Sequence, residues 1–217
     1  MLQTIQSREI TLYQLETKFD LQLVENEIFF REWQDNLPEI TDVEKQGLDR
    51  VKASYRNLTK YPPLLENTVK MVVLSPLLDL AGFYLDPFHI KSEQSVEIAE
   101  ENEGVIVRGQ IDVLVLAEEF WAIVIESKKA AFSLEVGKPQ LLTYMLANPH
   151  PEKPAYGLIT NGSSFRFVKL VKGETNQYAV SKLFDIFNPG NELYIVLSVL
   201  KRQGRVKHTL MLPIQPN

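Results

Sequence analysis

Residues 105–128 read VIVRGQIDVLVLAEEFWAIVIESK, and they carry the strongest structural signal of the chain. Apolar residues fill most positions of two runs, Val105–Leu116 and Phe120–Lys128, which a turn signal at residues 117–119 separates. Apolar runs of this kind are typical of strands that are covered on both faces. We therefore expect an antiparallel hairpin inside a sheet, with a three-residue turn centred on Glu118.

Three polar side chains interrupt this hairpin at the end far from its turn. Because side chains alternate along a strand, Asp112 shares a face with Glu126 and Lys128 of the second strand. The expected turn places Asp112 opposite Val124 and diagonal to Glu126, so that the two carboxylates converge. Buried carboxylates need a compensating charge, and Mg²⁺ takes such oxygen ligands. A plain Glu126–Lys128 ion pair at a solvated strand end explains the same spacing, so both interpretations stay open.

Helices are expected before and after the hairpin. Residues 64–81 have apolar positions at helical spacing with a break at Pro76, and Glu66 in the first turn could supply a third carboxylate. Residues 133–147 follow the hairpin, and Gln140 and Tyr144 share one face of that helix because they lie four residues apart. An amide and a phenol there can hold a water, a phosphate or a base edge, or simply pack together.

The remaining segments complete a mixed α/β domain. We expect residues 1–60 to form an N-terminal helical extension, because the apolar positions of residues 11–34 recur at helical spacing and a second helix follows at 42–58. Residues 61–217 are expected to form the main domain. Further strands are expected at 84–90, 96–99, 156–160 and 165–171, turns at 101–104 and 161–162, and a last helix at 191–202.

Composition narrows the function classes. The 217 residues include no cysteine, which argues against disulfides and thiolate zinc sites. No apolar run reaches the roughly 18 residues of a membrane span and no signal-peptide pattern is present at the start, so we expect a cytoplasmic protein without a membrane partner. The net charge of −5 combines −3 over residues 1–60, −9 over residues 61–127 and +7 over residues 128–217. This gradient agrees with a cation site beside a phosphate-binding surface, and equally with an ordinary mixed surface.

The sequence lacks the residues that a histidine zinc site, a serine nucleophile or a nucleotide-binding phosphate loop requires. The three histidines, His89, His150 and His208, are scattered and have no zinc-ligand spacing. No G-x-S-x-G sequence marks a nucleophilic serine. Gly137-Lys138 lacks the earlier glycine of a phosphate loop, so no nucleotide cofactor is expected.

The polar residues resemble those of a known superfamily. Asp112, then Glu126-Ser127-Lys128, then Gln140-Leu141-Leu142-Thr143-Tyr144, with Glu66 upstream, resemble the PD-(D/E)xK nucleases and their QxxxY helix motif. Residues 64–168, with GQIDVLV, IVIESKK, PQLLTYM and LITNGSSFRF, are similar to the N-terminal nuclease domain of the R subunits of type I restriction enzymes. Ile111 stands where the motif has proline. The resemblance implies a restriction-endonuclease-like core, a central mixed sheet flanked by helices in the order αβββαβ.

The resemblance also implies a function, the hydrolysis of DNA phosphodiester bonds by an endonuclease in a restriction or DNA-repair system. Lys128 would stabilise the transition state, while Gln140 and Tyr144 would position the substrate strand. A homodimer agrees with the way that many nucleases cut both strands. The implied ligands of Mg²⁺ (or Mn²⁺) are Glu66, Asp112, Glu126 and the backbone carbonyl of Ser127. The candidates for phosphate contacts, each equally explained as a solvated surface residue, are Lys129, Lys138, Arg166 and Lys169.

A function of another class remains open. The chain could be a catalytically silent relative that keeps the nuclease fold as a DNA-binding or assembly module and uses its N-terminal helices as an interface.

Overall fold

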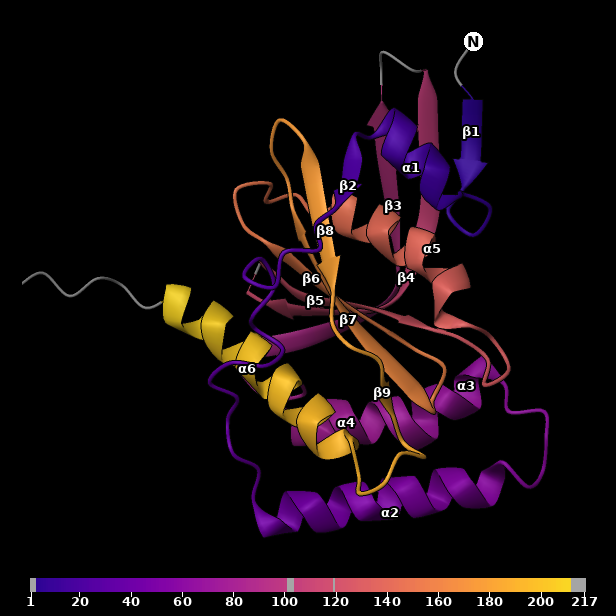
Figure 1. Cartoon of the computed structure of the whole chain (residues 1–217), viewed down its shortest axis with the longest axis vertical. Coiled ribbons are helices and arrows are strands. Elements are labelled where there is room, and N and C mark those ends of the chain that lie inside the picture. Colours follow the sequence, from indigo (N-terminus) through magenta and orange to yellow (C-terminus); the bar gives the residue numbers. More distant parts are fainter. Residues whose placement is uncertain (1–2, 101–103, 119, 212–217) are drawn as a thin grey trace, which may run out of the picture.

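The computed structural model describes residues 3–100, 104–118 and 120–211. Within these residues, nine strands form one mixed sheet with helices on both faces (Figure 1). The main path of the sheet is β1-β4-β5-β6-β7-β8-β2, while β3 pairs with β4 and β9 with β7. The strands are β1 (Gln3–Gln6), β2 (Leu21–Leu23), β3 (Phe88–Glu100), β4 (Val105–Ala117), β5 (Phe120–Ser127), β6 (Ala155–Thr160), β7 (Ser164–Val171), β8 (Asn176–Val180) and β9 (Phe184–Asp185).

Each face of the sheet buries its own apolar core. Helices α1 (Leu12–Lys18) and α5 (Leu134–Leu146) cover one face, where Leu114 and Val124 are buried. On the other face, α2 (Asp42–Leu58), α4 (Ser75–Leu80) and α6 (Leu193–Met211) enclose Val113 and Ile125 (Figure 1). The two central strands are therefore covered on both sides, as their apolar runs indicated. No helix in the described part of the chain is long and apolar enough to cross a membrane.

The central hairpin is present, but its expected register is wrong. Leu114, not Asp112, lies opposite Val124. The turn is tighter than expected, because Ala117 already pairs with Phe120, and the ladder then shifts by one residue at a β-bulge. A bulge is a local insertion that counting along two uninterrupted strands does not anticipate.

The helical segment that carries Glu66 is confirmed, and it widens in its middle. Helix α3 (Glu66–Val69), a π-helical turn η1 (Lys70–Leu74) and α4 follow one another without a break. Pro76 lacks the N–H that an α-helix would direct to the carbonyl four residues earlier, which accounts for an irregular turn at this point. The segment ends before Gly82, whose φ of +81° is a conformation that glycine adopts without strain.

The expectation that residues 1–60 are helical throughout is wrong. Strands β1 and β2 add to the sheet as parallel partners of β4 and β8. Asp20, with φ of +45°, separates α1 from β2 and interrupts the helical spacing on which the expectation rested. The second helix is confirmed as α2, whose start is capped by Thr41.

Several other boundaries differ from those expected. A single strand, β3, replaces the two short strands expected at 84–90 and 96–99. It begins only after Pro87, because proline has no N–H to donate to a strand ladder. Strands β8 and β9 were not expected, and α6 continues beyond residue 202. The expected turns at 101–104 and 117–119 include positions 101–103 and 119, which lie outside the described residues.

Strand β4 changes partner halfway along one edge. On that edge β1 pairs with residues 105–108 and β5 pairs with residues 113–117, while β3 pairs along the opposite edge. Residues 109–112 lie between the two ladders. This short stretch contains Asp112, so the change of partner falls at one of the expected functional residues.

Candidate active site

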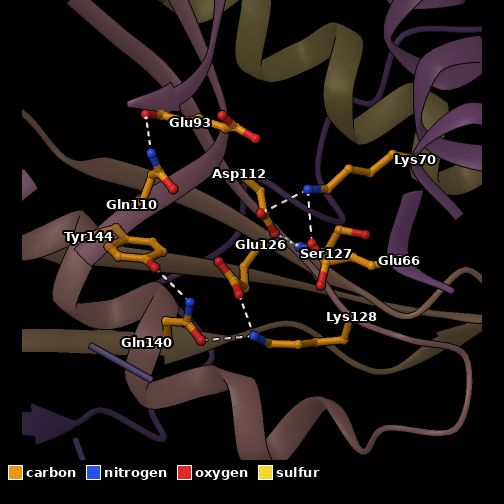
Figure 2. A network of polar contacts seen from close by, with 10 residues as sticks. All are labelled: Glu66, Lys70, Glu93, Gln110, Asp112, Glu126, Ser127, Lys128, Gln140 and Tyr144. Atoms are coloured by element: carbon orange, nitrogen blue, oxygen red, sulfur yellow. Dashed lines mark hydrogen bonds and ion pairs between the residues drawn. The ribbon is translucent and has the colours of Figure 1, made fainter. Parts of the chain in front are cut away.

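The polar residues singled out in the sequence meet at the end of β5 that is far from the β4–β5 turn (Figure 2). They come from α3, β4, β5 and α5, which are distant in the sequence but adjacent in the sheet and the layers that cover it. The network has two branches, one centred on Asp112 and the other on Lys128.

The first branch is built around Asp112 at the change of partner on β4. Its Oδ2 accepts a hydrogen bond of 2.8 Å from the backbone N–H of Ser127, and its Oδ1 lies 2.8 Å from Nζ of Lys70. The same ammonium lies 2.9 Å from Oε1 of Glu66, one helical turn earlier. Asp112 and Glu66, the possible third carboxylate, thus contact the same lysine ammonium.

The second branch runs from β5 to α5. Nζ of Lys128 lies 2.5 Å from Oε1 of Glu126 and donates a hydrogen bond of 2.8 Å to Oε1 of Gln140. Nε2 of Gln140 donates to the hydroxyl of Tyr144 at 2.6 Å, and that hydroxyl lies 3.1 Å from Oγ of Ser7. The amide and the phenol of α5 therefore bond to each other, and the amide also contacts the lysine.

Glu126 is the most buried carboxylate of the site. Its side chain is 2% exposed, against 17% for Asp112 and 34% for Glu66. Burial, together with repulsion from Asp112 and Glu66, raises the pKa of Glu126 to about 8, although Lys128 opposes this rise. Strong pKa perturbation by burial and a specific charge partner is common at functional sites.

Close packing holds Lys128 and the start of α5 together. A Cβ atom built on Gly137 would lie 2.8 Å from Cε of Lys128 and 2.6 Å from Cδ1 of Ile159, so only glycine fits this turn of α5 without a shift. The side-chain amide of Asn161 donates to the carbonyls of Ala130 and Phe132 and so fixes the loop that joins β5 to α5. The Asn161-Gly162 turn that the sequence showed is therefore a support of the site.

A divalent cation was expected here, and the donor chemistry fits one. Glu66, Asp112 and Glu126 supply carboxylate oxygens, which Mg²⁺ and Mn²⁺ prefer. Oε2 of Glu126 is buried and accepts no hydrogen bond in the described part of the chain. This oxygen is therefore available as a ligand of a metal ion. Among the described residues, no group of three His, Asp or Glu side chains is already arranged around a common point as in a finished metal site.

Ser127 contributes through its backbone. It is fully buried at the end of β5, and its N–H orients Asp112. Its hydroxyl is buried and has no partner among the described residues.

The four basic residues expected at phosphates differ in their surroundings. Lys129 is exposed beside Lys128. Lys138 and Arg166 both pair with Glu135, at 2.5 and 2.6 Å. Lys169 lies farther along β7, where it pairs with Glu32 at 2.6 Å.

Two residues of the network were not found from the sequence. Lys70 could have been found, because it follows Glu66 at the i,i+4 spacing that joins a carboxylate to a lysine on one helix face. Ser7 gave no such signal. It reaches Tyr144 only because β1 pairs with β4, and a Cβ atom on Gly109 would lie 2.2 Å from its Oγ.

A hollow of about 740 Å³ begins at Gln140 and Tyr144. Its walls come from β1, β3, β4 and α5, and it lies beside the stretch where β4 changes partner. Its polar wall residues include Gln6, Arg8, Ser95, Arg108 and Gln110.

Comparison with models of known protein families gives no match to this chain, and comparison with curated proteins gives none either.

Proposed function

We propose that this chain is a deoxyribonuclease, an endonuclease of the PD-(D/E)xK type that depends on Mg²⁺ or Mn²⁺. The observation that carries the proposal is the meeting of Asp112, Glu126, Lys128 and Gln140 in one network, with Glu66 and Tyr144 at its two ends. Their residue types, their order along the chain and their contacts in space agree with one chemistry.

The arrangement of elements supports the finer fold assignment. The helical segment α3–α4, the three antiparallel strands β3–β5, helix α5 and strand β6 follow in the order αβββαβ. Strand β6 pairs in parallel with β5, so α5 is the crossover between them. This is the order that we propose as a restriction-endonuclease-like core.

In the proposed mechanism, each side chain has a role that follows from its contacts. Glu66, Asp112, Glu126 and the Ser127 carbonyl would hold the metal ion, whose charge would polarise the scissile phosphate and lower the pKa of a water. Lys128 stabilises the negative charge that develops on the phosphate and orients the attacking water. Gln140 holds the Lys128 ammonium in place at 2.8 Å and, with Tyr144, positions the substrate strand.

The hollow beside Gln140 and Tyr144 is the proposed path of the DNA strand. Its volume is within the range of ordinary ligand sites, and its wall is rich in hydrogen-bonding groups. Arg8 in that wall and the exposed Lys129 near Lys128 are the proposed phosphate contacts. Arg108 in the same wall pairs with Glu97 at 2.6 Å and would first have to leave that partner. Lys138 and Arg166 pair with Glu135 and would have to leave it before they could contact a phosphate. Lys169 is not among the proposed contacts, because it is held by Glu32.

The test is the conversion of supercoiled plasmid to nicked and linear DNA with Mg²⁺ or Mn²⁺. We expect the wild type to cut, Lys128→Ala and Asp112→Ala to lose cutting by about 10²-fold or more, and chelation to stop it. Lys201→Ala is the control, because Lys201 also pairs with a glutamate, Glu44, but between α2 and α6. Cutting that persists in Lys128→Ala with the same metal dependence would refute the assignment.

A silent DNA-binding or assembly module is the second candidate. Lys70 between Glu66 and Asp112 favours it, because two carboxylates with a lysine already between them do not require a metal ion. In that case DNA binding would survive Asp112→Ala and chelation, and no cutting would be found with either metal.

A further inference from the structure

Lys70 has an unusual set of partners for a lysine on a helix. Its ammonium lies 2.9 Å from Glu66 on the same helical segment and 2.8 Å from Asp112 on the sheet, and its side chain is 25% exposed (Figure 2). The ammonium therefore joins the α3 helix to the centre of the site. A single surface ion pair contributes little to stability, but a shared, partly buried ammonium attracts two carboxylates at once and offsets their mutual repulsion.

The backbone at Lys70 is irregular as well. Lys70 is the first residue of the π-helical turn, and its carbonyl accepts the hydrogen bond of the Ser75 N–H, five residues later. Such turns occur often at functional sites, because the wider turn changes the direction of the side chains on it. The irregular turn thus begins at the residue that bridges the two carboxylates.

The charge around Lys70 is what a cation site needs. Glu66 and Asp112 each lie within 2.9 Å of the same ammonium, so their carboxylates face each other across a short gap. Without a positive charge between them, Glu66 and Asp112 would repel each other across the gap between helix and sheet. The ammonium of Lys70 provides that charge within the chain itself.

We infer that Lys70 is a built-in substitute for the metal ion, which holds Glu66 and Asp112 together when no divalent cation is bound and competes with the cation for them. This inference rests on the proposed function. It adds that metal binding requires Lys70 to leave the carboxylates, so that the lysine sets the metal affinity of the site.

The main experiment is calorimetric titration of the full chain with Mn²⁺ and with Mg²⁺, in the absence of DNA. Lys70→Met removes the competing charge, and we expect it to bind Mn²⁺ about tenfold more tightly or better than the wild type. Its metal-free form should melt at a lower temperature than the wild type, and saturating Mn²⁺ should restore most of that loss. Lys70→Arg keeps the charge and should bind metal no more tightly than the wild type. Lys201→Met, a remote lysine of a similar pair, should leave the metal affinity unchanged.

Equal or weaker Mn²⁺ binding by Lys70→Met would overturn the inference. If the wild type binds Mn²⁺ and cuts DNA in that case, the proposed function stands and only the role of Lys70 fails. If neither protein binds either metal, the inference and the metal-dependent function fail together.

A second measurement reads the bridge in the wild-type protein itself. The ¹⁵N resonance of the Lys70 ammonium, assigned by its loss in Lys70→Arg, reports directly on the bridge in the wild type. Saturating Mg²⁺ should shift it toward the position of a solvated lysine, while the resonance of the Lys169 ammonium, held by Glu32, should not move. A Lys70 resonance that stays in place while Mg²⁺ binds would contradict the competition.

Discussion

Two buried lysine–glutamate pairs in this molecule have the same residue types and opposite electrostatics. Lys128 and Glu126 lie in the candidate site, whereas Lys169 and Glu32 join β7 to the segment between β2 and α2. Burial opposes ionisation in both glutamates. In Glu32, hydrogen bonds from Lys169 and Tyr156 outweigh it and lower the pKa, while in Glu126 the neighbours Asp112 and Glu66 add to it and raise the pKa.

The difference shows what distinguishes a structural pair from a functional one. The Glu32 carboxylate accepts from the ammonium of Lys169 at 2.6 Å and from the hydroxyl of Tyr156 at 2.9 Å. Glu126 has one oxygen on Lys128 and the other buried without a partner among the described residues. Around Glu32 one carboxylate faces one ammonium, whereas the candidate site gathers three carboxylates around two ammonium groups, namely Glu66, Asp112 and Glu126 around Lys70 and Lys128. The site as a whole is therefore one positive charge short, as expected of a site that receives a cation.

The largest expected contrast is in DNA cutting by the two glutamine variants. Glu126→Gln should lower plasmid cutting by about 10²- to 10³-fold, because it removes a metal-binding charge next to the scissile phosphate. Glu32→Gln should stay within about twofold of the wild type, because Glu32 contacts no residue of the site. Both rates are measured at saturating Mg²⁺ or Mn²⁺, and equal losses in the two variants would remove the functional distinction.

The two pairs should also respond to pH with opposite signs. The pKa of Glu126 is raised to about 8 in the folded protein, so its contribution to stability is complete below about pH 4.5 and is lost as the pH rises to 8. The free energy of unfolding of the wild type should therefore fall relative to Glu126→Gln, by up to about 4 kcal/mol between pH 5 and pH 8.

For Glu32 the pKa is lowered, so its contribution is present above the unfolded pKa and is lost as the pH falls. The wild type should therefore lose stability relative to Glu32→Gln on acidification. Urea unfolding of the wild type and both variants from about pH 3 to about pH 8, with a chelator present, checks the two slopes, and slopes of the same sign would contradict the comparison.

Loss of the lysine should cost more stability in the structural pair. Lys169→Met leaves the partly buried Glu32 charge beside an apolar side chain, and we expect a loss of about 2 kcal/mol at pH 7. Lys128→Met should cost about 1 kcal/mol, because Glu126, with its pKa of about 8, can take up a proton instead. Urea unfolding in chelator measures both losses, and a larger loss for Lys128→Met would reverse the interpretation.

The smallest expected effect comes from removing one hydroxyl near each pair. Tyr144→Phe takes away the partner of Gln140 and should lower cutting about tenfold, which corresponds to about 1.4 kcal/mol. Tyr156→Phe takes away a partner of Glu32 and should cost about 1 kcal/mol of stability without a change in cutting. Cutting rates and unfolding curves of the two variants, compared side by side, check both halves. Unchanged cutting by Tyr144→Phe would remove Tyr144 from the proposed substrate path.

Much of the central domain was predictable because its signals are local. The apolar runs of β4 and β5, the turn at Asn161-Gly162 and the start of α2 at Thr41 depend on residues close together in the sequence. The four-residue spacing of Gln140 and Tyr144 correctly predicted that they share a helix face, and the structure adds that they bond to each other. The helical spacing of the apolar residues near residue 20 gave a wrong prediction there, because such spacing does not report the positive φ of Asp20, which separates α1 from β2.

The amino-acid sequence by itself determined which residues are available for chemistry, namely three carboxylates, a lysine and an amide–phenol pair in a given order, because residue type and short-range spacing are written in the chain. The register of the hairpin, the bridge of Lys70 from Glu66 to Asp112 and the approach of Ser7 to Tyr144 were decided only by the tertiary structure. Each of these depends on a bulge, a widened helical turn or a pairing between distant strands. Such features arise when elements pack together, and the sum of many weak contacts selects them rather than any local pattern.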